Sequence, residues 1–237
     1  MDTGILSAEY LKSVSANNGA VYCDVDGTLS HSNIVEPLIW VKKRILKFPI
    51  NYLGLTSIFL LCPYWLILDK ISRRKSNISI YKHYKNLPVA EVAKFAQIYY
   101  QRVFKKRIFQ EAIEFLRIFR ENGVRIVLIS GGIDLFLDPM ARELNADCLA
   151  VSLKKTNGFF TGEIDGEPLT GNIKAILLKQ HARQNNIDLN ISYALGDAIG
   201  DLDMLECVGN PIAVNPDNQL RKHAISRGWK IVYWKNK

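Results

Sequence analysis

Short apolar runs alternate with amphipathic stretches along most of this chain. The β-prone runs each end directly before polar residues and comprise Val21-Tyr22-Cys23, Val124 to Ile129 and Ile191 to Leu195. The helical patterns between and after them cover Arg107 to Glu121, Ile133 to Leu144 and Asn172 to Gln184. This alternation predicts an α/β fold with a Rossmann-like parallel sheet and helices on both faces.

The C-terminal half contains further strand signals. Ala150 to Ile164 includes the turn sequence Lys154-Lys155-Thr156-Asn157-Gly158 between strand-like residues, which predicts a β-hairpin. Pro211 to Val214 and Lys230 to Trp234 have the composition of the last strands.

The interval between the first two core strands spans about a hundred residues, far more than a loop of roughly two to six residues needs. We interpret 32–106 as a mostly helical cap domain inserted over the active site. The catalytic core then comprises 1–31 and 107–237. In a parallel sheet of this kind the ligand site lies beyond the carboxyl ends of the strands.

Composition narrows the function classes only partly. The chain has 31 Lys plus Arg against 23 Asp plus Glu, and this net charge of +8 suits nucleic acid, anionic lipid or phosphorylated substrates. A basic RNA-binding module is one alternative, but the chain has no recognisable nucleic-acid motif and its aromatic residues cluster in an apolar run, so we expect no nucleic-acid partner.

The cysteines and the N-terminus indicate where the protein works. The four cysteines are scattered without a CxxC pair, so neither a disulfide framework nor a zinc site is indicated. Residues 1–19 lack the basic start and apolar core of a secretory signal. We therefore expect a cytoplasmic protein with reduced thiols.

Two carboxylates stand where the first strand leaves the sheet, in Asp24-Val25-Asp26-Gly27-Thr28. Residues two apart in an extended chain point to the same side, so one carboxylate can attack while the other handles a proton. Such a pair suits hydrolysis of a phosphomonoester, which also needs positive charge around the phosphoryl oxygens. An acidic turn with local side-chain caps is the alternative for this pentapeptide alone.

Further polar groups follow the later strands. Ser130-Gly131-Gly132 offers a hydroxyl and backbone N–H groups for a phosphate, or a plain helix N-cap. Lys174 lies at a helix start, where most lysines face water. Asp197 and Asp201 stand four apart after the third strand and suit a hard cation, or an acidic turn capping the next helix.

Taken together in this order, these elements resemble the four motifs of the haloacid dehalogenase (HAD) superfamily, and within it the phosphoserine-phosphatase-like branch. The resemblance covers Val21 to Thr28 and Arg107 to Trp234 and leaves the cap largely outside. It implies a HAD-type phosphatase that works through an aspartyl-phosphate intermediate. The complete motif set argues against a non-catalytic relative, while a phosphotransferase with the same intermediate remains an alternative.

The resemblance also assigns roles. Asp24 is the expected nucleophile, and Asp26 the general acid and then the base for water. Ser130, Gly131 and Lys174 are the expected phosphate-binding residues. The resemblance implies Mg²⁺ as cofactor, bound by the carboxylates of Asp24 and Asp197 and by the backbone carbonyl of Asp26, with Asp201 orienting the ligands from outside.

Two departures from phosphoserine phosphatases concern the substrate. Those enzymes carry a glutamate nine positions after the nucleophile, where this chain has Asn33, with Glu36 nearby as a possible substitute. Gly200 also replaces the asparagine that is usual in their fourth motif. Asn33 and Glu36 are therefore candidate substrate-selecting residues, and serine phosphate is not the substrate that this pattern favours.

The cap contains an apolar segment, 48–68, without a charged residue and with basic residues on both sides. We interpret it as a broken, interfacial hairpin at an anionic membrane surface, with Trp40, Tyr52, Tyr64 and Trp65 near the interface. The cap is similar to phosphatase-like domains of some plant glycerol-3-phosphate acyltransferases, which act on lysophosphatidate.

The apolar cap sets the expected substrate and partners. A lipid phosphate, lysophosphatidate or phosphatidate, is the expected substrate, acted on at the cytoplasmic membrane face. The alternative is a soluble phosphatase for a small metabolite, phosphoserine included, with the cap used for a homodimer.

Overall fold

The computed structural model describes residues 7–46 and 50–235. The extreme ends of the predicted core and positions 48 and 49 of the predicted apolar segment lie outside the described residues.

Within the described residues, seven strands form one sheet in the order β4-β3-β2-β1-β5-β6-β7. All neighbouring pairs are parallel except β3 and β4, which form the predicted antiparallel hairpin. The strands are β1 (Ala20–Cys23), β2 (Arg125–Ile133), β3 (Asp147–Thr156), β4 (Phe159–Asp165), β5 (Tyr193–Gly196), β6 (Asn210–Val214) and β7 (Lys230–Val232). The predicted α/β, Rossmann-like architecture is therefore confirmed.

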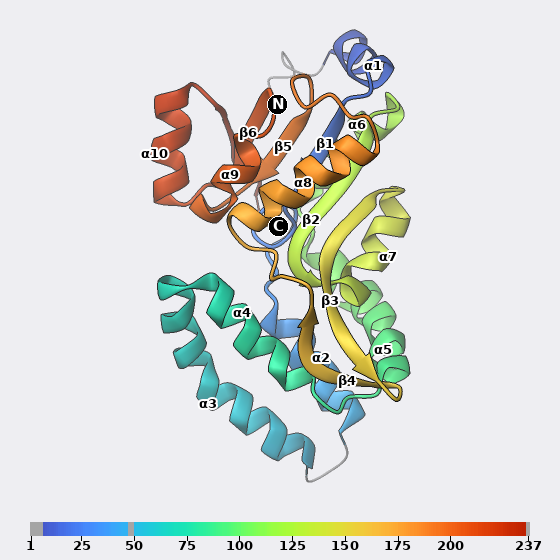
Figure 1. Ribbon diagram of the computed structural model, residues 1–237, viewed down its shortest axis with the longest axis vertical. Helices are drawn as coiled ribbons and strands as arrows, with labels where there is room; N and C mark the ends of the chain where they lie inside the picture. Colours follow the sequence, from blue (N-terminus) through green and yellow to red (C-terminus); the bar gives the residue numbers. More distant parts are fainter. Residues whose placement is uncertain (1–6, 47–49, 236–237) are drawn as a thin grey trace.

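The central strand β1 is fully buried along its length, as expected for a parallel strand covered on both faces. In Figure 1, α8 crosses the near face of the sheet. Helix α10 has a local reason to begin and end where it does: Asp217 accepts hydrogen bonds from its first N–H groups, and Gly228 ends it in the left-handed conformation. The core helices are α1 (Ala8–Ala16), α6 (Gln110–Glu121), α7 (Asp134–Leu144), α8 (Asn172–Gln184), α9 (Leu202–Leu205) and α10 (Asn218–Arg227), with short 3₁₀ turns η2 (Phe104–Arg107) and η3 (Ile199–Asp201).

Between β1 and β2 the chain forms a helical segment, which occupies the lower part of Figure 1 and which we call the cap. Its elements are α2 (Val35–Ile45), α3 (Ile50–Ile71), α4 (Arg73–Tyr81), η1 (Lys82–Tyr84) and α5 (Val89–Arg102). The boundaries 32–106 for a separate cap domain stay a prediction.

The hairpin β3–β4 joins the cap to the core. The backbone N–H of Asn86 donates to the carbonyl oxygen of Phe160 at 2.8 Å, and that of Phe160 donates to Leu87 at 3.0 Å. Gly162 has a φ of 83°, and a Cβ there would lie 2.9 Å from the carbonyl oxygen of Lys82, so only glycine lets the two backbones approach. The hairpin thus fixes the position of the cap over the sheet.

The apolar segment departs from the predicted broken hairpin, because α3 continues through Pro63 as one helix. Two of the expected interfacial aromatics pack against the protein: Trp65 is buried and its Nε1 donates to Ser79 Oγ at 3.0 Å, and Trp40 is half-buried and packs edge-on against Tyr99. An apolar helix can bury one face while the other stays exposed, which sequence alone does not resolve. Among the described residues, no helix combines the length and apolar character needed to cross a membrane.

Candidate active site

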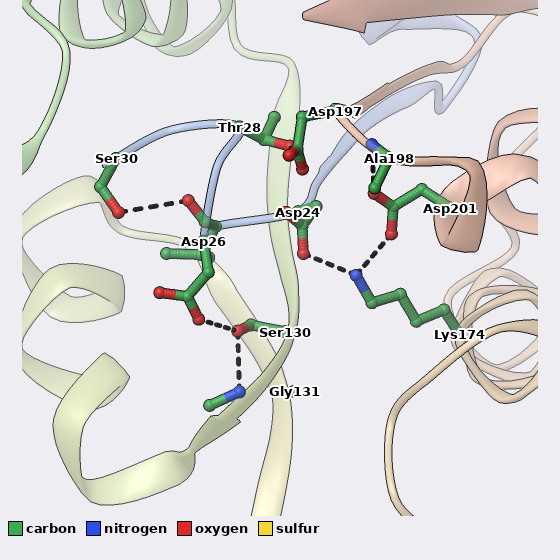
Figure 2. A network of polar contacts seen from close by, with 12 residues as sticks. Asp24, Asp26, Thr28, Ser30, Ser130, Gly131, Lys174, Asp197, Ala198 and Asp201 are labelled. Carbon is green, nitrogen blue, oxygen red and sulfur yellow. Dashed lines mark hydrogen bonds and ion pairs between the residues drawn. The ribbon is translucent and has the colours of Figure 1, made fainter. Parts of the chain in front are cut away.

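The candidate residues meet beyond the carboxyl ends of β1 and β5 and beside the last part of β2 (Figure 2). Asp24 directly follows β1, and Asp197 directly follows β5, which is the neighbour of β1 in the sheet. Their side chains and that of Lys174, from the first turn of α8, are aimed at one point although they come from distant parts of the chain.

Lys174 lies between two carboxylates. Its Nζ donates to Asp24 Oδ1 at 2.6 Å and to Asp201 Oδ1 at 2.6 Å, and all three side chains are buried. Burial disfavours the charged form of Lys174, but Asp201 and Asp24 outweigh it and raise the pKa of the ammonium group. Lys174 is therefore a fixed positive charge beside the candidate nucleophile rather than a solvated surface lysine.

Gly27 and Thr28, the last two residues of the sequence Asp24 to Thr28, both contact the position of Asp197. Gly27 has a φ of 95°, and a Cβ there would lie 2.2 Å from Asp197 Oδ2, so a side chain would expel this carboxylate. Thr28 Oγ1 donates to Asp197 Oδ1 at 3.0 Å. The turn after β1 therefore positions Asp197, a function that the sequence analysis did not assign to either residue.

Asp24, Asp197 and Asp201 offer carboxylate oxygens that all lie within 4.8 Å of one another. Burial, together with repulsion from Asp201, raises the pKa of Asp197 to about 6. Burial likewise raises the pKa of Asp24, and Asp201 and Asp197 add to this effect against the attraction of Lys174. Three carboxylates around one ammonium group leave a net negative charge, and carboxylate oxygens are hard ligands. Both properties fit a divalent cation such as Mg²⁺.

Asp26 lies on the side of Asp24 opposite Lys174 (Figure 2), and its carboxylate accepts hydrogen bonds from hydroxyl groups. Ser32 Oγ donates to Asp26 Oδ1, and Ser130 Oγ lies 3.4 Å from Asp26 Oδ2. Ser30 Oγ contacts Ser32 Oγ at 2.6 Å and extends the network. Burial raises the pKa of Asp26 against these hydrogen bonds, which suits a carboxyl group that must carry a proton.

Ser130 lies inside β2 and not at its end, since the strand continues to Ile133. It is not the N-cap of α7; Ile133 occupies that position without a side-chain hydrogen bond. Ser130 Oγ instead accepts from the N–H of Gly132 at 2.9 Å. The adjacent Gly131 carbonyl accepts from the hydroxyl of Tyr81 in the cap, so this strand end also contacts the cap.

A cavity of about 730 Å³ lies between the cap and these residues. Helix α4 lines it with Arg73 and Asn77, neither of which the sequence analysis singled out. Arg73 lies beside Gly200, where a Cβ would be 3.9 Å from its Nη1, an ordinary van der Waals contact. Although burial disfavours its charge, Asp69, Asp201, Asp24 and Asp197 raise the pKa of Arg73. The cap thus contributes a cation to the site.

The candidate substrate-selecting residues also line the cavity. Asn33 Oδ1 accepts from the N–H groups of Val35 and Glu36 at 3.0 and 3.1 Å and so begins helix α2. Glu36 Oε1 is bound by Arg107 Nη2 at 2.7 Å. The carboxylate of Glu36 is therefore already paired, which no sequence signal indicated.

Comparison with known proteins agrees with this geometry. A model of the haloacid dehalogenase-like hydrolase family matches residues 21–206. The chain is 34% identical over 127 residues to the "Inhibition of morphological differentiation protein" of Streptomyces azureus, a match covering 53% of this chain and 46% of that protein. It is 30% identical over 144 residues to phosphoserine phosphatase SerB1 of Mycobacterium tuberculosis, with 60% of this chain and 47% of that protein covered.

Among solved structures, a substrate-bound phosphoserine phosphatase superposes with a TM-score of 0.68 at 21% identity, covering 93% of this chain and 94% of that chain. At this identity the likeness shows the shared fold. The matches to the curated relatives span about half of each relative's length.

Proposed function

The chain belongs to the family of haloacid dehalogenase-like hydrolases, and on this premise we propose that it is a Mg²⁺-dependent phosphomonoesterase with Asp24 as the nucleophile. The observation that supports this most directly is the convergence of Asp24, Lys174 and Asp201 at 2.6 Å contacts beside Asp197. Arg73 and Lys174 provide positive charge where the phosphoryl oxygens would lie.

Each of these residues has a chemical task in the proposed reaction. Asp24 attacks phosphorus, and the phosphoryl group leaves the substrate alcohol for the carboxylate. Asp26 donates a proton to the departing alkoxide and then accepts one from the water that hydrolyses the aspartyl phosphate. Ser130, Gly131 and Lys174 bind the phosphoryl oxygens. Asp24, Asp197 and the Asp26 carbonyl are the proposed Mg²⁺ ligands, and Asp201 would orient them without binding the ion. The cation supplies the charge that offsets repulsion between two anions.

A small phosphorylated metabolite is the substrate class that the comparisons favour, because the relative from Mycobacterium tuberculosis is a phosphoserine phosphatase. The lipid phosphate expected from the apolar segment gains no support from the relatives, and it stays a prediction. Transfer of the phosphoryl group to an alcohol would use the same intermediate and differs only in the acceptor.

Phosphate release from a panel of soluble phosphomonoesters tests the proposal. We expect turnover with Mg²⁺, loss of turnover in EDTA, and recovery when Mg²⁺ is restored. Full activity in the chelator would contradict the metal role, and no turnover of any ester by the folded protein would refute the proposed function.

The exposed face of α3 supports a separate proposal, that the cap docks on an anionic membrane surface from the cytoplasm. Large apolar side chains on this helix are 52–80% exposed: Phe59, Leu60, Tyr64, Leu66, Ile67 and Ile71. Exposed basic side chains lie on all three helices of this corner: Lys43 on α2, Lys70 on α3 and Lys75 on α4, and α2 and α4 both pack against α3. Apolar burial and attraction to anionic head groups would then act together.

Flotation with anionic vesicles tests this docking. Changing Leu60 and Ile67 to Ser should release the protein, whereas changing Ile225, on α10 of the core and as exposed as Ile67, to Ser should not. Absence of flotation at low salt would contradict membrane docking. A dimer that the Leu60/Ile67 change dissociates would also contradict it, and would favour a homodimer through the cap.

A further inference from the structure

One wall of the cavity on the cap side is apolar. Side chains from α2 and the residue before it, from α3 and α4, and from the segment before α8 line this wall: Ile34, Ile39, Trp65, Leu66, Ile80 and Leu169. Trp65, Ile80 and Leu169 are at most 5% exposed, so they form the inner wall, whereas Leu66 is 69% exposed and lies at the outer edge. The volume of about 730 Å³ exceeds what a phosphoryl group alone requires.

The cap side of the cavity offers no unpaired negative charge. Among the described residues that line it, Glu36 and Asp69 are the carboxylates outside the catalytic group of Asp24, Asp26, Asp197 and Asp201. Glu36 is paired with Arg107 at 2.7 Å, and Asp69 with Arg73 at 3.6 Å. A substrate ammonium group would have to break one of these pairs to find a counter-ion.

The Glu36–Arg107 pair is held from both sides. Asn33 fixes the first turn of α2, which carries Glu36. The carbonyl oxygen of Arg107 accepts from the N–H of His31 at 3.1 Å, so the two chain segments that connect cap and core are joined here. Because both backbones are fixed, Glu36 cannot turn toward a ligand without losing Arg107.

We infer that the alcohol part of the substrate is uncharged and largely apolar, and that the Glu36–Arg107 ion pair excludes substrates with an ammonium group near the phosphate. This inference rests on the proposed phosphomonoesterase function and specifies its substrate class. The apolar wall binds the carbon skeleton, while the paired carboxylates leave an ammonium group desolvated without compensation.

A matched pair of esters tests the inference on the intact protein. Ethyl phosphate and O-phosphoethanolamine differ by one ammonium group, and the amino alcohol is the better leaving group, so intrinsic reactivity does not favour the ethyl ester. We expect kcat/KM to be at least tenfold higher for ethyl phosphate. It should rise about fourfold per methylene from ethyl to hexyl phosphate, the factor for burying one CH₂ group.

Variants at Arg107 and Glu36 test whether the ion pair itself excludes the ammonium group, as opposed to a general loss of activity. Arg107→Met should free Glu36 and raise kcat/KM for O-phosphoethanolamine relative to ethyl phosphate at least tenfold. Glu36→Gln in the same chain should abolish this gain. Arg74→Met is the control, because it breaks an ion pair with Glu167 on residues that do not line the cavity, and it should leave the ratio unchanged.

A comparison of a monomeric ester with an ester in vesicles shows whether the apolar alcohol is a soluble molecule or a lipid. Turnover of monomeric hexyl phosphate that exceeds turnover of a long-chain ester in vesicles identifies a soluble alcohol, and the reverse identifies a lipid; either result supports the apolar class. Preference of the parent protein for O-phosphoethanolamine, or an unchanged ratio in folded Arg107→Met, would overturn the inference while leaving the phosphatase intact. Failure to hydrolyse any ester would refute the proposed function and the inference with it.

Discussion

Replacement of Lys174 by Met removes the positive charge between two buried carboxylates and keeps most of the length of the side chain. In the parent, Lys174 Nζ contacts Asp24 and Asp201 at 2.6 Å each, and the Lys174 side chain is 7% exposed. The variant retains three neighbouring carboxylates with no ammonium among them. We therefore expect two separate losses, one in catalysis and one in stability.

The structure sets the size of both losses. A group that stabilises transition-state charge in a closed site contributes about 10²–10³ in rate. Removing one partner of a buried ion pair costs about 3–5 kcal/mol of unfolding free energy, because the remaining charge is buried without compensation. For a chain of this size that corresponds to a fall in Tm of roughly 6–20 °C. Added Mg²⁺ should restore part of the stability, since it neutralises the same carboxylates, but not the rate.

The assay combines steady-state hydrolysis of one soluble monoester with calorimetric melting, each with and without Mg²⁺. Lys179→Met is the matched control, because Lys179 is on the same helix α8 but exposed. Activity of Lys174→Met within tenfold of the parent, or equal damage from Lys179→Met, would refute the placement of Lys174 in the site.

The remaining predictions concern the carboxylates, the cap and the serine network. Asp197→Asn should raise Tm without metal by about 2–4 °C, because it removes one of the crowded buried charges, and should abolish the stabilisation by Mg²⁺ in the same calorimetric scan. Arg73→Leu should lower kcat/KM about tenfold or more, while Arg74→Leu, its neighbour outside the cavity, should have little effect in the same assay. Ser32→Ala should slow turnover by about tenfold, since Asp26 loses a hydroxyl donor that orients it, and a rate equal to the parent's would show that this hydrogen bond has no catalytic role.

Much of the fold could be predicted because local patterns determine it. The helix predicted at Asn172 to Gln184 has those bounds in the structure, and β1 ends directly before Asp24 as the apolar run indicated. β2 is longer than predicted, since Gly131 and Gly132 continue the strand instead of ending it. A glycine pair signals a turn in sequence, but Ile133 beyond it pairs with Val151 of β3 across an irregularity in register, and this pairing extends the strand.

The residues that were missed depend on contacts between distant segments. Arg73 enters the site only because α4 lies over the sheet, and Arg107 matters only because it meets Glu36 across the two connections of the cap. Thr28 was part of a recognised motif, but its bond to Asp197 joins residues 169 positions apart. The sequence likewise does not show which face of α3 is buried, since apolar residues occupy both its buried and its exposed side.

Trapping of the covalent intermediate tests the central claim most directly. In Asp26→Asn the base for the second step is lost, whereas an aryl phosphate with a good leaving group needs no acid for the first step, so the phosphoryl group should accumulate on the enzyme. After acid quenching, peptide mass spectrometry should locate one phosphoryl group on Asp24, and Asp24→Asn should carry none. A phosphoryl group on another residue, or turnover of the parent and no covalent phosphate in Asp26→Asn, would contradict the account.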